Sequence, residues 1–313
     1  MQQSIFILQL PDPDRKSHGG TGMHEMEVKS ILSASNGMNL YRGCLHGCIY
    51  CDARSRCYQI NHRFEDIAVK RNAPELLEQA LRSRRKRCMI GTGGMSDPYI
   101  PIEKGLRLTR RCLELIEEYG YGLAIQTKSD LILRDLDILK SINRKTKCVV
   151  QITMTTYEEE LCRILEPNVC TTARRFEVLE IMREEGIPTV CWMTPILPFI
   201  NDTEENINGL LDYCIRAKVY GVLQFGIGVT LRDGDREYFY EKLDEHFPGM
   251  KQKYIHHFGN AYEIPSPAQA ELRKLLKDRC RKHGIVYDAE ELFRYMRTFE
   301  DKGAGEQISF QFV

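Results

Sequence analysis

Short apolar segments recur along the central part of the chain and predict the strands of one sheet. They cover residues 88–92, 122–127, 148–154, 189–193 and 222–227. Each is nearly continuous in apolar character, which is typical of parallel strands that are buried on both faces. Successive segments start about 26 to 41 residues apart, which leaves room for a crossover helix each time. With residues 39–42 (NLYR) as a first strand, the pattern predicts six β/α units.

Segments with helical periodicity lie between these strands and beyond the last one. The predicted helices cover residues 104–119, 172–185, 202–218, 267–283 and 288–297. Asp202 and Glu205 form a predicted capping pair at the start of helix 202–218. Gly186, with a proline shortly after it, ends helix 172–185.

The predicted elements divide the chain into three parts. Residues 1–37 are rich in glycine and polar side chains and predict a loop or an arm. Residues 38–232 carry the β/α units. Residues 233–313 predict a helical cap that packs on the open side of the sheet rather than an independent domain. The fold class is therefore α/β.

The charge of the chain is balanced, with 44 Lys and Arg residues against 44 Asp and Glu residues. Zero net charge argues against nucleic acid binding through bulk electrostatics, so any polyanion must meet a local patch. The one strong basic run, at 82–87, leads into a predicted strand from the end opposite the expected site, and a solvated surface is the favoured interpretation. No stretch reaches the roughly 20 apolar residues of a membrane span, and no export signal is visible. We expect a cytoplasmic protein.

Three of the twelve cysteines have a spacing that predicts a metal centre. Cys44, Cys48 and Cys51 follow a C-x3-C-x2-C pattern in the segment NLYRGCLHGCIYCD. Gly43 and Gly47 stand beside the first two cysteines and permit the positive φ angles that a loop needs to wrap three sulfurs round one centre.

Zinc and an iron–sulfur cluster are the two metal centres to compare. A structural zinc site takes four ligands, usually from paired C-x2-C segments, and the sequence has no second such pair. His46 would complete four ligands, but it lies inside the tight loop, where reaching the same metal would strain the chain. A cubane iron–sulfur cluster normally takes four thiolates, so three would leave one iron open to a small molecule. The sequence favours the cluster.

The motif, with Tyr50 before the last cysteine, resembles the cluster motif of the radical S-adenosylmethionine (SAM) enzymes. Segments similar to the branch that contains spore photoproduct lyase are YRGCLHGCIYCDAR, SDPYIPIEKGLRLTRRCLELI, IQTKSDLILRDLDIL, TMTTYEEELCRILEP and PILPFIND. The resemblance covers roughly residues 38–232. It implies a partial (β/α)6 TIM-type barrel with its site at the carboxyl ends of the strands.

The resemblance implies two cofactors. A [4Fe–4S] cluster would be held by Cys44, Cys48 and Cys51, and its open iron would chelate the amino and carboxylate groups of SAM. Reductive cleavage of SAM would give methionine and a 5′-deoxyadenosyl radical, which abstracts hydrogen from a substrate. A small electron-donor protein of the flavodoxin or ferredoxin type is the implied partner.

Two glycines follow the second predicted strand, in the segment GTGGMSDPY. Gly93 and Gly94 permit close approach of the backbone to a ligand, with a plain βα turn as the alternative. Radical SAM enzymes commonly carry two glycines and an acid here to hold the SAM amino group. Met95 stands in the place of the acid, so Ser96, Asp97 or backbone carbonyls would take its role.

Four further residues match SAM contacts in this branch. Lys128, after the third strand, resembles the lysine that pairs with the SAM carboxylate, and a solvated surface lysine is the alternative. Thr153 matches a hydroxyl contact, although β-propensity explains a threonine there equally well. Ile196 matches a backbone contact to the adenine, and Tyr50 would lie beside that ring.

Cys57 and Tyr99 fall near the predicted mouth of the barrel, where either could donate a hydrogen atom to a product radical; a structural role is the alternative for both. In spore photoproduct lyase, the donor is a cysteine immediately before a Thr-Ser-Asp string after the second strand. The corresponding string in this chain is GMSD at 94–97, so Gly94 replaces the donor cysteine.

The sequence thus predicts a radical SAM enzyme whose substrate is not the thymine photoproduct of DNA. A DNA photoproduct repair lyase is the second hypothesis, with nucleic acid as a partner that the charge balance does not favour. A non-catalytic iron–sulfur redox or scaffold protein is the third. Lys128 and the glycine pair argue against this third hypothesis, since neither is needed to store electrons.

Overall fold

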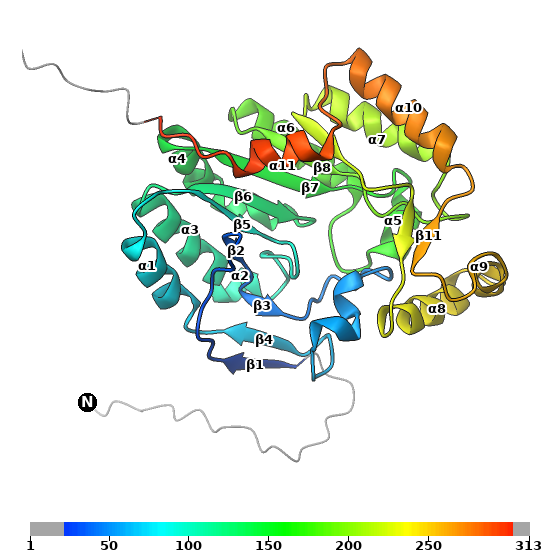
Figure 1. Cartoon of the computed structure of the whole chain (residues 1–313), viewed down its shortest axis with the longest axis horizontal. Coiled ribbons are helices and arrows are strands. Elements are labelled where there is room, and N and C mark those ends of the chain that lie inside the picture. Colours follow the sequence, from blue (N-terminus) through cyan, green and yellow to red (C-terminus); the bar gives the residue numbers. More distant parts are fainter. Residues whose placement is uncertain (1–21, 303–313) are drawn as a thin grey trace, which may run out of the picture.

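The computed structural model describes residues 22–302 and contains one six-stranded parallel sheet (Figure 1). The strand order is β2-β5-β6-β7-β8-β9, so each strand lies beside the preceding one. The strands are β2 (Gly37–Met38), β5 (Met89–Thr92), β6 (Gly122–Thr127), β7 (Cys148–Thr153), β8 (Thr189–Trp192) and β9 (Gly221–Leu223). This arrangement confirms the predicted α/β fold class and the partial barrel of six β/α units. Residues 1–21 of the predicted arm lie outside the described residues.

Helices cover one face of this sheet and build the main core with it. They are α1 (Ala73–Ser83), α3 (Leu108–Glu118), α4 (Leu136–Lys145), α6 (Thr172–Glu184) and α7 (Glu204–Arg216). Alternate strand residues such as Ile125, Val150 and Val222 point toward these helices and are fully buried among their apolar side chains. Two short helices, α2 (Glu103–Leu106) and α5 (Glu159–Leu165), stand before α3 and α6.

The opposite face of the sheet is covered near the amino ends of the strands by α11 (Ala289–Arg297), drawn in red in Figure 1. Leu292 and Met296 of this helix pack against Val149, Val190 and other inward-facing strand residues. A Cβ atom on Gly221 would lie 2.3 Å from the Leu292 side chain, which shows how closely the helix approaches. Only the carboxyl half of this face remains available for a site.

The predicted first strand is displaced. Residues 39–42 do not enter the main sheet, because Tyr41–Arg42 forms β3 and pairs antiparallel with β4 (Ile67–Lys70). The barrel strand is Gly37–Met38, which pairs with the end of β5. β4 also pairs with β1 (Met23–Met26), so the predicted arm contributes a strand to a second, three-stranded sheet.

The predicted last strand, 222–227, is too long. Strand β9 ends at Leu223 because Gly226 takes a φ of 136° and its amide donates to the side chain of Gln224, which turns the chain out of the sheet. The chain then forms β10 (Gly228–Thr230), which pairs antiparallel with β11 (Glu263–Pro265) beside the barrel mouth. The other predicted strands are confirmed to within a residue at each end.

Two predicted helices also differ in detail. The helix predicted at 104–119 is broken at Arg107, whose φ of 51° is left-handed, and α2 and α3 lie on either side of it. Helix α7 is capped by Thr203, whose hydroxyl accepts from the Asn206 amide, and not by Asp202. Asp202 accepts instead from the hydroxyl of Ser266. The predicted stop at Gly186 is confirmed, since its φ is 69°.

Between β10 and residue 302, four helices complete the described part of the fold. They are α8 (Asp235–His246), α9 (Met250–Phe258), α10 (Gln269–Lys282) and α11, and they include both helices predicted there. Helix α10 packs on α7, and α8 and α9 pack beside the cysteine loop, where Tyr50, Leu243 and Tyr254 share one apolar cluster. Within residues 22–302, no helix combines enough length and apolar character to cross a membrane.

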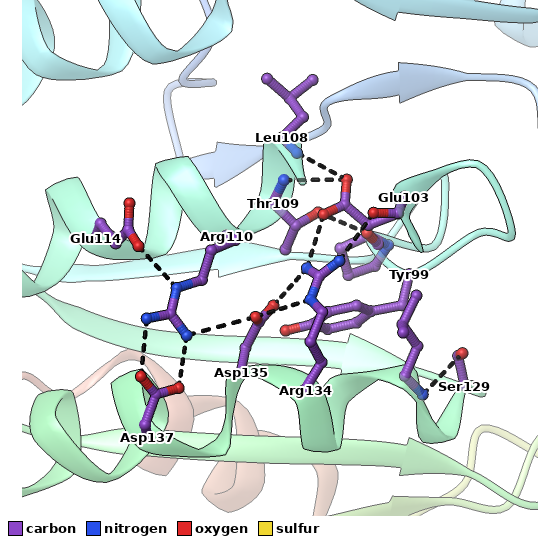
Figure 2. A network of polar contacts seen from close by, with 12 residues as sticks. Tyr99, Glu103, Leu108, Thr109, Arg110, Glu114, Ser129, Arg134, Asp135 and Asp137 are labelled. Atoms are coloured by element: carbon purple, nitrogen blue, oxygen red, sulfur yellow. Dashed lines mark hydrogen bonds and ion pairs between the residues drawn. The ribbon is translucent and has the colours of Figure 1, made fainter. Parts of the chain in front are cut away.

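A network of buried charges fixes the break between α2 and α3 (Figure 2). Glu103 is fully buried and accepts hydrogen bonds from the Leu108 and Thr109 amides at 3.0 and 3.1 Å. Its other oxygen accepts from Arg134, which also donates to the buried carboxylate of Asp135. Because a buried carboxylate is tolerated only when its lone pairs are satisfied, these bonds hold the start of α3 in place.

Candidate active site

The carboxyl ends of the strands open into a cleft of about 730 Å³. Its walls are the cysteine loop, the segments that follow β5, β6, β8 and β9, and the ribbon of β10 and β11. Parallel β/α folds place their sites at this end. The cleft therefore lies where the sequence predicts the site, and the basic run at 82–87 precedes β5 at the opposite end, as expected.

Cys44, Cys48 and Cys51 all line this cleft, from a loop that leaves β3 at Gly43. The predicted positive φ angles are confirmed, at 88° for Gly43 and 72° for Gly47. A Cβ atom on Gly43 would lie 2.4 Å from the carbonyl oxygen of Phe64, so a larger residue cannot stand there without moving the backbone. The glycines thus allow the loop to curl over the strand ends.

The three thiols are desolvated. Burial raises the pKa of Cys44 to about 12, with the charge of Cys51 adding to the shift, and burial also raises the pKa values of Cys48 and Cys51. The positive charge of Lys128 acts in the opposite direction on the last two. Thiolates bound in this position would therefore gain from nearby cationic groups.

The residues present fit an iron–sulfur cluster. Three thiols of one loop line the cleft, and they are the donor set of a cubane cluster that leaves one iron without a protein ligand. In the part of the chain that the structure describes, no three or more His, Cys, Asp and Glu side chains are arranged to hold one metal ion.

A buried ion pair stands behind the cysteine loop. The hydroxyl of Tyr50 donates to Glu166, which follows α5, and Arg175 of α6 forms an ion pair with the same carboxylate at 2.5 Å. Only 1% of the side chain of either Glu166 or Arg175 is exposed. Burial opposes ionisation of Glu166, but the charges of Arg175 and Lys128 hold its pKa below the usual range. Arg175 also donates to the Thr153 carbonyl at 3.0 Å, which ties the end of β7 to the same pair.

Sequence reasoning missed Glu166 and Arg175. Arg175 lies on α6 next to a second arginine, Arg174, and the polarity of one side chain does not reveal whether it faces the core. Glu166 stands before a proline in a loop, where a carboxylate is ordinarily solvated. The available signal was an arginine at a position of α6 where helical spacing places it with the buried residues Thr172 and Leu179.

Lys128 lies in the cleft and not on the open surface. Its backbone amide donates to Asp97 at 2.8 Å, which fixes the end of β6. Burial opposes its charge, but Cys48 and Glu166 raise its pKa, so the side chain stays cationic. The ammonium lies 5.9 Å from the centre of the Tyr50 ring and forms no hydrogen bond or ion pair with any described residue. The Lys128 ammonium is therefore available to bind an anionic group of a ligand beside the cysteine loop.

The two predicted glycines of the cleft differ in how they are constrained. Gly93 has a φ of 99°, and a Cβ atom there would lie 2.1 Å from the Gln126 carbonyl oxygen. Gly94 has ordinary backbone geometry, and a Cβ atom there would meet nothing within 4 Å. Gly93 is therefore required by the turn, whereas Gly94 leaves open space in the cleft wall.

Ser96 and Asp97 are engaged by the protein itself. The Ser96 hydroxyl donates to the Gly43 carbonyl at 2.7 Å. The Asp97 carboxylate accepts from the Thr127 hydroxyl at 2.7 Å and from the Tyr99 and Lys128 amides at 2.8 Å. Both side chains thus connect the cysteine loop and β6 to the turn after β5.

His46 is buried beside Asp97. The two side chains approach to 3.5 Å, and only 3% of His46 is exposed. Burial lowers the pKa of His46, although the Asp97 charge opposes the shift. The imidazole is therefore held against the turn after β5, which agrees with a structural role for this residue rather than that of a fourth metal ligand.

Thr153 and Ile196 lie at different depths. Thr153 lines the cleft at the end of β7, and its hydroxyl accepts from Gln126 at 3.4 Å. The side chain of Ile196 is fully buried in the main core and does not line the cleft. The preceding residues Thr194 and Pro195 line it instead. The segment that contains Ile196 therefore reaches the cleft, but Thr194 and Pro195 face it and the Ile196 side chain does not.

The predicted position of Tyr99 at the mouth is wrong. Its ring is 1% exposed in the core behind the turn, and it does not line the cleft. Figure 2 shows its hydroxyl directed toward Asp135. Burial and then the charge of Asp135 raise its pKa well above the usual range. The reason for this placement is that the Tyr99 amide donates to Asp97, which turns the side chain away from the strand ends.

Cys57 lies at the rim and not in the wall of the cleft. It is exposed, and Arg232 donates to its sulfur at 3.3 Å. Arg232 does line the cleft, and its guanidinium lies over the ring of Tyr262 at 4.8 Å. Cys57 is therefore adjacent to the cleft through one intervening side chain.

Exposed apolar side chains are concentrated at this cleft. Six large apolar side chains are exposed in residues 22–302, and three of them, Met95, Phe225 and Tyr262, line its wall. The sequence placed Phe225 inside a strand, so its exposure was not foreseen. Exposed apolar groups that are concentrated in a concave site indicate contact with a ligand.

Comparison with known families identifies the central part of the chain. The model of the radical SAM superfamily matches residues 38–214, which is more than half of the chain. The matched segment begins at β2 and ends within α7. It contains the cysteine loop, the turn after β5 and Lys128.

Two relatives illustrate the sequence similarity. An uncharacterized protein of Methanocaldococcus jannaschii is 34% identical over 176 residues, which is 56% of this chain and 65% of that protein. The chain thus spans slightly less than two thirds of that relative. An uncharacterized protein of Mycobacterium tuberculosis is 26% identical over 291 residues, which is 86% of this chain and 83% of the relative.

Solved structures share the fold. A mutant of spore photoproduct lyase superimposes with a TM-score of 0.62 at 14% identity, covering 85% of this chain and 81% of the other. Spore photoproduct lyase in complex with a dinucleoside spore photoproduct gives a TM-score of 0.60 at 14% identity, with the same coverage. A further mutant of that lyase, with bound AdoMet and the dinucleoside, gives 0.58 at 15% identity, covering 80% of this chain and 74% of the other.

Proposed function

The chain belongs to the radical SAM superfamily, and we propose that it uses a [4Fe–4S] cluster bound by Cys44, Cys48 and Cys51 to act on a substrate in the cleft. The observation that carries the proposal is that one cleft holds three cysteine thiols and the Lys128 ammonium, which has no ion-pair partner within residues 22–302. When bound, the cluster and SAM would supply a 5′-deoxyadenosyl radical, which removes a hydrogen atom from the substrate.

Lys128 is the residue that would hold the carboxylate of SAM. Its ammonium is cationic, half-buried and without a hydrogen bond or ion pair among the described residues, so a charge-assisted hydrogen bond there replaces no existing one. Tyr50 is held beside it by Glu166 and would border the adenine. The buried pair of Glu166 and Arg175 keeps Tyr50 in position.

Backbone carbonyls at the turn after β5 would accept from the SAM amino group. Ser96 and Asp97 already make hydrogen bonds within the protein, and these bonds fix both side chains between the loop and the sheet. Gly93 and Gly94 leave their backbone accessible to a ligand because neither has a side chain to cover it. Thr153, Thr194 and Pro195 would border the adenosine from the neighbouring strand ends.

Residues 38–232 would form the catalytic barrel, and residues 233–313 would cap it. The ribbon of β10 and β11 supplies one wall of the cleft, which reduces the access of water and oxygen to a radical formed there. The reaction needs one electron for each SAM cleaved, and a small flavodoxin or ferredoxin is the proposed donor.

A DNA photoproduct repair lyase is the alternative activity. The shared fold with spore photoproduct lyase favours it. Gly94 in place of a donor cysteine, and Tyr99 turned into the core, argue against it, because neither position supplies a hydrogen donor to the cleft. A non-catalytic iron–sulfur protein would have no use for a cationic lysine beside a large cleft.

The test is anaerobic reconstitution of the protein with iron and sulfide, followed by incubation with a reductant and SAM. We expect a brown protein that forms 5′-deoxyadenosine and methionine. The variant Cys44→Ala/Cys48→Ala/Cys51→Ala should be colourless, iron-poor and inactive, whereas Cys57→Ala, which changes a cysteine outside the cleft wall, should keep its iron. A full cluster in the triple variant, or no cleavage of SAM by the loaded wild type, contradicts the proposal.

A further inference from the structure

A second groove, of about 840 Å³, adjoins the cleft along helix α10. Gln224 lines this groove, and the next residue, Phe225, lines the cleft. On the facing side, Gln269 lines the cleft and Ala270 lines the groove. Because the two hollows meet at these residues, an extended ligand in the groove can reach the cleft.

The groove has an excess of positive charge. The cations that line it from successive turns of α10 are Arg273, Lys274, Lys277 and Arg281. Two carboxylates, Asp288 and Glu291, also line it, and Asp288 caps α11 by accepting from the Glu291 amide at 2.8 Å. Lys274 and Lys277 are exposed and form no ion pair within residues 22–302. The sequence suggested no patch here because helical spacing separates these cations along the chain.

A buried donor in the groove has no acceptor. Gln224 is 7% exposed, and its side-chain oxygen accepts from the Gly226 amide at 2.9 Å. Its amide nitrogen is buried and has no hydrogen bond partner among the described residues. A buried donor of this kind is unfavourable, so an acceptor oxygen brought by a ligand would be stabilising. This observation points to a ligand with a hydrogen bond acceptor, independently of the charge.

An aromatic ring stands where the groove meets the cleft. Phe225 is 60% exposed, and its ring lies nearly parallel to that of Phe293, with centroids 6.1 Å apart and planes at 19°. Trp192 makes an edge contact with the same ring at 5.7 Å. The ring is therefore braced by the protein while much of its surface stays in solvent, which is the arrangement of a stacking platform.

We propose that the groove binds the phosphodiester backbone of a single nucleic acid strand and that one base stacks on Phe225 at the entrance of the cleft. Phosphate oxygens match the cations of α10 and the amide of Gln224, and a base matches the exposed ring. An acidic peptide would match the cations alone. The inference rests on the proposed function only in taking the cleft as the place where hydrogen is abstracted; binding of the strand requires neither SAM nor an electron.

The experiment measures fluorescence anisotropy of short labelled oligothymidylate and oligouridylate with the reconstituted full chain. We expect both to bind, with an affinity that falls steeply between about 50 and 200 mM salt. The variant Lys274→Glu/Lys277→Glu should bind at least about tenfold more weakly and lower the salt slope by about 1 for each lysine. The matched control is Arg85→Glu/Lys86→Glu, which makes the same charge change at exposed positions at the other end of the barrel and should bind like the wild type.

A second variant separates stacking from charge. Phe225→Ala should weaken binding of the oligonucleotides by about tenfold and leave binding of inorganic polyphosphate unchanged, because polyphosphate has no base. Equal losses in the two charge-reversal variants, or competition by oligoglutamate as effective as that by unlabelled oligonucleotide, overturn the proposal. Stronger binding of one oligonucleotide also supports it.

The same preparation distinguishes the two proposals. If oligonucleotides bind in the groove but SAM is not cleaved by the loaded protein, the proposed function fails and the groove assignment stands. If SAM is cleaved but no oligonucleotide binds, the groove assignment fails alone. Equal thermal midpoints of the variants and the wild type exclude unfolding as the cause of lost binding.

Discussion

Tyr50 and Glu166, which are 116 residues apart along the chain, are joined by a hydrogen bond from the tyrosine hydroxyl to the carboxylate. Tyr50 belongs to the cysteine loop. Glu166 lies between α5 and α6, and Arg175 of α6 forms an ion pair with its carboxylate. The Tyr50 hydroxyl and the Arg175 guanidinium thus share one buried carboxylate, whereas Nε and Nη2 of Arg175 have no hydrogen bond partner among the described residues. The position of the cysteine loop therefore depends on an ion pair formed between other parts of the barrel.

Removing Arg175 should destabilise the protein strongly. In Arg175→Met, the buried carboxylate of Glu166 loses its direct partner, and breaking a buried pair in this way costs about 3 to 5 kcal/mol. The neighbouring Arg174→Met removes ion pairs of a side chain that is 41% exposed, and its effect should stay below about 1 kcal/mol. Urea unfolding of both variants measures the difference, and equal free energies of unfolding would refute the role given to the pair.

The same pair predicts how stability changes with pH. The folded-state pKa of Glu166 lies below its ordinary value of 4.5, because Arg175 and Lys128 outweigh burial. A depressed carboxylate pKa stabilises the fold above the unfolded pKa, and this contribution disappears as the pH falls through the folded pKa. The stability advantage of the wild type over Glu166→Gln should therefore be largest near pH 7 and shrink below about pH 4. An advantage that grows on acidification would show that the buried carboxyl is neutral.

The strands could be predicted from sequence because their apolar runs are continuous and evenly spaced. The displaced first strand could not, since Gly37–Met38 is too short to produce a pattern and NLYR is equally suited to the second sheet. The last strand was predicted too long for a similar reason, since the local sequence does not show where it ends. Phe225 continues an apolar run in sequence, and only the Gln224 side chain and the φ of Gly226 end the strand before it.

Within the site, sequence located the residues that belong to a motif and missed those that act through tertiary contact. Cys44, Cys48 and Cys51 follow a recognisable spacing, Lys128 was predicted from the family resemblance, and all four line the cleft. Glu166 lies in a loop where nothing local indicates burial. Tyr99 was misplaced because its direction depends on a hydrogen bond of its backbone to Asp97, which the sequence does not reveal.

Gly93 and Gly94 should respond very differently to alanine. Gly93→Ala places a Cβ atom 2.1 Å from a backbone oxygen in a left-handed conformation, so it should cost more than about 2 kcal/mol and disturb the turn. Gly94→Ala meets open space and should change the free energy of unfolding by less than about 0.5 kcal/mol. Denaturant unfolding compares them directly. A Gly93→Ala variant as stable as Gly94→Ala would contradict the geometry of the turn.

Lys128→Ala should weaken SAM binding without loss of iron. A charge-assisted hydrogen bond to a carboxylate in a partly desolvated site contributes about 1.5 to 3 kcal/mol, which corresponds to roughly 10- to 150-fold in affinity. Lys104→Ala, at an exposed position of α2, is the control and should bind SAM like the wild type. Calorimetry under anaerobic conditions gives both dissociation constants. Unchanged affinity in Lys128→Ala would place the SAM carboxylate elsewhere.

The wild type should not convert a spore photoproduct into intact thymines, although it should cleave SAM slowly without substrate. Repair ends with transfer of a hydrogen atom to the product radical, and Gly94 has no side chain to supply one. Tyr99 is buried behind the turn, and Cys57 lies outside the cleft wall next to Arg232, so neither is placed to substitute. The assay offers a dinucleoside photoproduct and photoproduct-containing DNA to the reduced enzyme, beside Gly94→Cys, whose new side chain has open space in the cleft. Multiple turnovers to thymine by the wild type would establish a repair lyase, whereas turnover by Gly94→Cys alone would show that the missing donor is what separates this chain from that activity.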